Sequence, residues 1–140
     1  MNLIMTPAIL ASIAVVVAMQ TPPAADAVKM SQRDFTRLAA AQKILIVDVR
    51  PATAFTDGHI PRAISLPLKK ALWPGAYAET IARLKAAGKP VVIYCACSGE
   101  TLSLELAGML NEQGVTDTHV LVGGWNTWAN AGNRIAKGPK

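Results

Sequence analysis

One short stretch of the chain reads Val91-Val92-Ile93-Tyr94-Cys95-Ala96-Cys97-Ser98-Gly99-Glu100-Thr101. Its first four residues form a continuous apolar run, which predicts a strand covered on both faces in a parallel sheet. Ser98 and Gly99 favour a tight turn. An amphipathic helix is expected from Thr101 to Gln113, ended by Gly114. A strand, a short loop and a helix in this order indicate an α/β unit.

Strands and helices are expected to alternate on both sides of this unit. The remaining predicted strands span residues 44–49, 63–66 and 118–122. The remaining predicted helical segments span residues 32–41, 51–55, 77–87 and 125–131, and the first begins with a capping-box-like pair, Ser31 and Asp34. No internal repeat is present. The pattern predicts a three-layer α/β domain over residues 28–140, with a mostly parallel central sheet flanked by helices.

Composition limits the possible functions. The chain has 140 residues, two cysteines and a formal net charge of +5, which suits one ordinary domain. Basic residues are spread along the chain without a run, so nucleic-acid binding is not indicated. Two cysteines are too few for a disulfide framework but enough for a reactive site.

Residues 1–27 resemble an export signal. The stretch Leu3–Met19 is almost entirely apolar, and Ala25-Asp26-Ala27 supplies a small-x-small cleavage site. No Lys or Arg precedes the apolar core, so an uncleaved membrane anchor and a buried N-terminal helix remain alternatives. The first two interpretations place residues 28–140 outside the cytoplasm, in the periplasm or anchored facing it. Membrane contact is expected only through this segment.

Cys95 is the candidate nucleophile. In parallel α/β sheets, ligands bind beyond the carboxyl ends of the strands, and Cys95 directly follows the strand 91–94. Backbone N–H groups of a tight strand-to-helix loop can converge on one atom, and the helix N-terminus adds partial positive charge. Both effects favour the reactive thiolate. The alternative is a small, buried, inert cysteine at the end of a strand.

Further motifs accompany this loop along the chain. They are Asp48-Val49-Arg50, Gly58-His59-Ile60-Pro61-Arg62-Ala63-Ile64, Leu66-Pro67, Val92-Ile93-Tyr94-Cys95, and Leu121-Val122-Gly123-Gly124-Trp125 with Trp128. In this order they resemble the single-domain rhodanese-like sulfurtransferases over about residues 28 to 132. The resemblance implies the rhodanese fold, with Cys95 as the catalytic residue. The rest of the active-site loop would then be Ala96, Cys97, Ser98, Gly99, Glu100 and Thr101.

The resemblance also implies a reaction. In this family the cysteine takes a sulfane sulfur from thiosulfate or a persulfide donor, holds it as a persulfide and passes it to a thiol or cyanide. That chemistry needs no cofactor, and the sequence carries no cofactor-binding motif. A protein thiol is a further possible partner. The alternative function is a non-catalytic rhodanese-like binding or redox-sensing module; phosphatase or arsenate chemistry is a weaker third.

The loop departs from the family pattern at Glu100, where many members have Arg. A carboxylate near the sulfur would raise the pKa of the thiol and repel an anionic donor. We expect Glu100 instead to turn outward and cap the following helix, where negative charge is favoured. Arg50 is then the best remaining cation for a pocket that also includes Gly124 and Trp125. Gly123-Gly124 fits a turn that needs positive φ or close backbone approach.

Cys97 is the second departure, and three interpretations are open. As a resolving thiol, it would attack a persulfide or sulfenate on Cys95 and close a small, easily reduced ring. As a metal ligand it would need partners beyond Cys95, and His59 and His119 have more ordinary structural roles. As a structural residue it would only fill volume in the loop.

Overall fold

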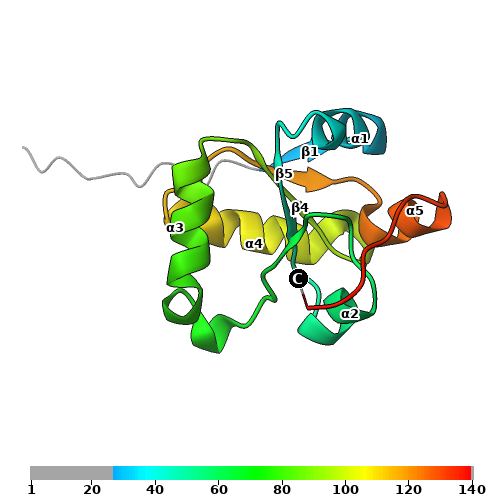
Figure 1. Ribbon diagram of the computed structural model, residues 1–140. Coiled ribbons are helices and arrows are strands. Elements are labelled where there is room, and N and C mark those ends of the chain that lie inside the picture. Colours follow the sequence, from blue (N-terminus) through cyan, green and yellow to red (C-terminus); the bar gives the residue numbers. More distant parts are fainter. Residues whose placement is uncertain (1–26, 140) are drawn as a thin grey trace, which may run out of the picture.

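A computed structural model of the protein describes residues 27–139 (Figure 1). Its strands are β1 (Val28–Met30), β2 (Leu45–Asp48), β3 (Ile64–Ser65), β4 (Val91–Tyr94) and β5 (Thr118–Leu121). They form one sheet in the order β1-β5-β4-β2-β3, and every neighbouring pair is parallel. The expected parallel sheet is therefore confirmed.

Within residues 27–139, five α-helices connect and cover the strands. They are α1 (Gln32–Ala40), α2 (Ala52–Asp57), α3 (Ala78–Ala87), α4 (Thr101–Glu112) and α5 (Gly124–Asn130). Each of the predicted helical segments appears within about two residues of its expected bounds. Helix α1 begins as expected, because the Ser31 side chain accepts a hydrogen bond from the Asp34 N–H at 3.1 Å.

The central strand β4 is buried on both faces, and its side chains alternate between two cores. Val91 and Ile93 lie in one core with residues of α3 and α4, such as Leu84 and Leu106. Val92 and Tyr94 lie in the other core, whose helical side chains are Phe35, Ala39, Phe55 and Trp128. The sheet thus has helices on both faces, which confirms the three-layer α/β architecture.

Two features of the chain are not among the sequence predictions. Strand β1 pairs with β5 at the edge of the sheet, and the long connection before α3 contains two 3₁₀ helices, Lys70–Leu72 and Gly75–Tyr77. β1 has only three residues, two of them exposed, so it carries too few buried positions to produce a strand pattern in the sequence.

The proposed signal or anchor over residues 1–27 lies outside the described residues, apart from Ala27. Within residues 27–139, no helix is long and apolar enough to cross a membrane.

Candidate functional site

The cysteine loop follows the carboxyl end of β4, at the sheet edge where ligands are expected. Cys95 continues the strand and is only 2% exposed, packed in the core beside α3 and α4. A 3₁₀ helix, Ser98–Glu100, then turns the chain into α4. Gly99 and Glu100 both have left-handed backbones, with φ of 69° and 57°. The loop thus reverses direction over very few residues.

The two cysteines are joined as a disulfide across Ala96, with their α-carbons 5.6 Å apart. Cys97 is half-buried and packs against the core that holds Cys95. The bond shows that Cys97 reaches the Cys95 sulfur, which the resolving-thiol interpretation requires. Cys97 therefore does more than fill volume in the loop. Among residues 27–139, no group of three or more potential ligands is placed to hold a metal ion.

The N-terminus of α4 contacts the Cys97 sulfur. The backbone N–H of Leu102, in the first turn of the helix, donates to Cys97 Sγ at 3.5 Å. The positive end of the helix and this N–H both favour negative charge on that sulfur. The amides were expected to converge on Cys95, whereas in this oxidised loop the contact is made to Cys97.

The first turn of α5 holds the backbone of the loop. The Trp125 N–H donates to the Cys95 carbonyl at 2.9 Å, and Asn126 Nδ2 donates to the Ala96 carbonyl at 3.3 Å. Gly123 and Gly124 have φ of 76° and 47°. A β-carbon on Gly124 would lie 2.2 Å from the Cys95 carbonyl oxygen. The expectation of positive φ and close backbone approach is confirmed.

Glu100 does not cap α4, so that expectation is wrong. Its side chain makes no hydrogen bond to the first turn of α4 and is buried, with the residue 8% exposed. Oε1 accepts the Gly123 N–H at 2.9 Å, and Oε2 lies 3.6 Å from Lys29 Nζ. Glu100 thus has a left-handed backbone, and its side chain binds the β5–α5 turn instead of the helix that follows it. Glu100 ties the cysteine loop to that turn and to β1.

Arg50 is engaged in a buried ion pair. Its guanidinium binds both Asp48 oxygens, with Nη2 2.7 Å from Oδ2, and Nη2 also donates to the Gly58 carbonyl at 2.6 Å. Burial alone would lower the pKa of Arg50, but the hydrogen bonds and charge of Asp48 raise it above its ordinary value. Arg50 is thus held in a structural ion pair with Asp48. Its role as an anion-binding cation stays a prediction.

Tyr94 completes this polar cluster. Its hydroxyl donates to Asp48 Oδ2 at 2.6 Å and accepts the Ile60 N–H at 3.1 Å. Burial, and then the neighbouring Asp48 charge, hold the pKa of Tyr94 far above its usual value. The register could have revealed this contact, because Asp48 and Tyr94 are paired at the ends of adjacent strands.

The indole of Trp125 joins the cluster to the cysteine loop. The ring lies 4.1 Å from the Arg50 guanidinium carbon and stacks with Tyr94 at 6.3 Å between centroids. The structure therefore brings together Arg50, Gly124, Trp125 and the backbone of Cys95. By contrast, Ser98 and Thr101 are exposed, and Thr101 Oγ1 only donates to the Ser98 carbonyl.

Sequence reasoning missed Lys29 and Asn126 as parts of the site. Both contacts join segments far apart in the chain, and neither residue belongs to a motif. No signal in a single sequence marks them.

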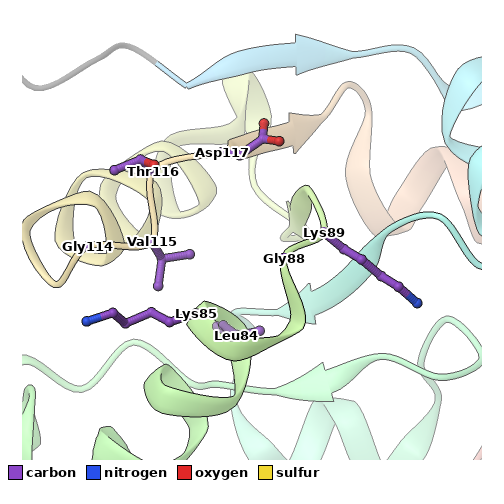
Figure 2. A pocket seen from close by; sticks show the side chains of 8 residues that line it. All are labelled: Leu84, Lys85, Gly88, Lys89, Gly114, Val115, Thr116 and Asp117. Carbon is purple, nitrogen blue, oxygen red and sulfur yellow. The ribbon is translucent and has the colours of Figure 1, made fainter.

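A hollow of about 210 Å³ lies at the opposite end of the sheet, between the loops that lead into β4 and β5 (Figure 2). It is lined by Leu84, Lys85, Gly88, Lys89, Gly114, Val115, Thr116 and Asp117. Figure 2 shows Lys85 and Lys89 extending in opposite directions, so their ammonium groups do not converge. Lys89 Nζ donates instead to the Gln42 carbonyl. The hollow contains neither cysteine and is separate from the cysteine loop.

Comparison with known proteins gives a consistent result. The family model for the rhodanese-like domain matches residues 31–131. The thiosulfate sulfurtransferase GlpE of Coxiella burnetii is 30% identical over 100 residues, which cover 71% of this chain and 85% of that protein. The adenylyltransferase and sulfurtransferase MOCS3 of Drosophila yakuba is 24% identical over 103 residues, covering 74% of this chain and 22% of its own length.

Solved structures agree with the sequence comparisons. The BH2092 protein from Bacillus halodurans has a TM-score of 0.59 at 27% identity, covering 79% of this chain and 77% of that one. A rhodanese-related protein from Thermoplasma volcanium has a TM-score of 0.58 at 16% identity, covering 78% of this chain and 97% of that one.

Proposed function

The chain belongs to the rhodanese-like domain family, and we propose from this membership that Cys95 is the residue on which it carries sulfur. The expected rhodanese-like fold is confirmed, and the relatives named as sulfurtransferases support that activity at the level of the family. The observation that carries the proposal is the position of Cys95, at the carboxyl end of the central strand and at the start of the strand-to-helix loop.

The proposed donor is thiosulfate or a persulfide. The Cys95 thiolate attacks the outer sulfur of thiosulfate, the sulfur–sulfur bond of the donor breaks, and sulfite leaves with the bonding electrons. Cys95 then carries a persulfide. A thiol or cyanide attacks the outer sulfur of that persulfide, and Cys95 leaves as the thiolate. The proposed partners are therefore small sulfur compounds, with a protein thiol as a further acceptor.

The reaction starts only after reduction. In the disulfide with Cys97, the Cys95 sulfur has no thiolate to offer. We therefore propose the dithiol as the active form. The helix N-terminus and the Leu102 N–H, close to the cysteine pair, support stabilisation of anionic sulfur there.

The experiment is a single turnover of the reduced protein. After dithiothreitol is removed without oxygen, thiosulfate is added and sulfite is measured. We expect about one sulfite per chain from the parent and from Cys97→Ser, and none from Cys95→Ser. The Cys97→Ser protein should also gain the mass of one sulfur atom on the peptide that contains Cys95. The parent and Cys97→Ser both keep Cys95. If neither protein releases sulfite, the proposal is overturned.

The disulfide favours a second candidate, a non-catalytic module that senses redox state. In that case the Cys95–Cys97 bond would form and break without sulfur transfer, and thiosulfate would release no sulfite from the dithiol form. Binding of a partner would then differ between the oxidised and reduced proteins. Cys95→Ser and Cys97→Ser would both abolish that difference.

We propose that residues 1–27 direct the domain out of the cytoplasm, as a cleaved signal or as an anchor. The support is the apolar stretch and the small-x-small site in the sequence. If the first 30 residues are fused to a reporter that works only after export, the reporter should be active. Retention of the reporter in the cytoplasm would contradict export.

A further inference from the structure

We propose that Cys97 displaces the outer sulfur from a persulfide on Cys95 and releases it as sulfide. This inference rests on the proposed function, because it needs the persulfide to form first. It adds a second activity: reduction of sulfane sulfur by the chain's own cysteine pair, rather than delivery to an outside acceptor.

Cys97 reaches the sulfur of Cys95. The two sulfurs are bonded in the structure, across a single intervening residue. The loop therefore adopts a conformation in which Cys97 Sγ meets Cys95 Sγ. A thiolate already held within the same loop acts at a far higher effective concentration than one arriving from solution.

The Cys97 sulfur lies at the N-terminus of α4. The Leu102 N–H donates to it from the first turn of α4, and α4 has twelve residues. A helix N-terminus and a donated N–H both stabilise negative charge on a nearby sulfur, and the thiolate is the nucleophilic form. Cys97 therefore has the properties of an attacking group.

The two cysteines differ in burial. Cys95 is 2% exposed, whereas Cys97 is half-buried. Little of Cys95 is therefore open to solution in this loop, whereas Cys97 approaches the Cys95 sulfur from inside the loop. The more exposed residue of the resulting disulfide is then Cys97.

Cys97 thiolate attacks Cys95 Sγ, the bond between Cys95 Sγ and the outer sulfur breaks, and the outer sulfur leaves with the electron pair and takes a proton to become hydrosulfide. The sulfane sulfur gains two electrons, and the two cysteines are oxidised to the disulfide. An external dithiol restores the thiols by attacking Cys97 Sγ, and its second thiol completes its own disulfide as Cys97 leaves.

The test extends the single turnover to three readouts: sulfite, sulfide and protein mass. Reduced, desalted protein is mixed with thiosulfate in oxygen-free buffer, and a sample without thiosulfate controls for oxidation by air. We expect the parent to release sulfite and sulfide in about equal amounts and to lose two hydrogen atoms as the disulfide forms. Cys97→Ser should release sulfite, retain one added sulfur and release no sulfide.

The outcomes separate the two proposals. Sulfite from both proteins, with the added sulfur retained on the parent and no sulfide, overturns this inference and leaves the proposed function standing. Equal sulfide from the parent and Cys97→Ser also overturns it, because Cys97 would then not be the source of the electrons. No sulfite from either protein overturns the proposed function itself. Sulfite release by Cys97→Ser shows at the same time that this variant is folded.

Discussion

The α-carbon of Gly124 lies against the backbone of Cys95, so closely that a β-carbon on Gly124 would be 2.2 Å from the Cys95 carbonyl oxygen. The next residue, Trp125, donates its N–H to that same oxygen. The β5–α5 turn therefore supports the backbone of the cysteine loop. Substitutions in the turn should alter the position of the loop and, with it, the reactivity of Cys95.

Gly124→Ala should destabilise the fold by about 2–4 kcal/mol, because the added methyl group meets backbone and φ is positive. Urea unfolding gives the free energy, and reduced protein gives the rate of sulfite release, which should fall in parallel. Gly108→Ala is the matched control, since a β-carbon there meets nothing within 4 Å and the residue lies within α4. If the two variants unfold at the same urea concentration, the claim that Gly124 has no room for a β-carbon is wrong.

Glu100→Ala should lower the free energy of unfolding by about 1–3 kcal/mol, because the Gly123 N–H loses its acceptor. Glu100→Gln keeps an oxygen at this position and should cost less. Unfolding in urea distinguishes the two. Lys29→Met tests the other contact; Lys29 is 60% exposed and should contribute little. Equal losses for Ala and Gln would show that the hydrogen bond is not the source of the stability.

Arg50→Met should destabilise the protein by about 3–5 kcal/mol, because it leaves the Asp48 carboxylate buried without its cation. Arg37→Ala is the control. Arg37 forms an exposed ion pair with Asp34, and its loss should cost less than about 1 kcal/mol. Equal free energies of unfolding for the two variants would contradict a structural role for the Asp48–Arg50 pair.

Tyr94 should make the protein sensitive to alkali. In the folded chain the pKa of its phenol is raised, whereas in the unfolded chain it is about 10. As the pH rises past that value, the unfolded state loses a proton that the folded state keeps. Stability therefore falls with rising pH, by up to about 1.4 kcal/mol per pH unit for this one group.

Tyr94→Phe should be less stable at neutral pH, by about 1–2 kcal/mol, because the Ile60 N–H loses its acceptor and Asp48 loses a donor. It should also show a shallower loss of stability between about pH 9 and about pH 11. Urea unfolding across this range measures the slope. Parallel curves for parent and Tyr94→Phe would mean that Tyr94 titrates alike in both states.

The sequence was sufficient for the buried elements and for the position of the loop. Runs such as 91–94, bounded by Pro90 and Cys95, carry a strong burial pattern. Gly88 ends α3 in a left-handed conformation, which glycine adopts readily. Edge strand β1 is short and exposed, so no such pattern marks it.

Glu100 shows why the site was harder to predict than the fold. Local reasoning favours a cap on the adjacent helix, but the Gly123 N–H lies 23 residues along the chain and offers a buried partner. Tertiary contacts of this kind decide side-chain roles and leave no local pattern. The disulfide was one of several open interpretations of Cys97 for the same reason.

The common direction of the five strands has a practical consequence for handling the protein. Because β1 runs parallel to β5 and β4, the chain enters the sheet at the pole opposite the cysteines. A bead, dye or carrier attached ahead of Val28 would face away from the reactive pole. Immobilisation from that side should leave the cysteine loop facing the solution.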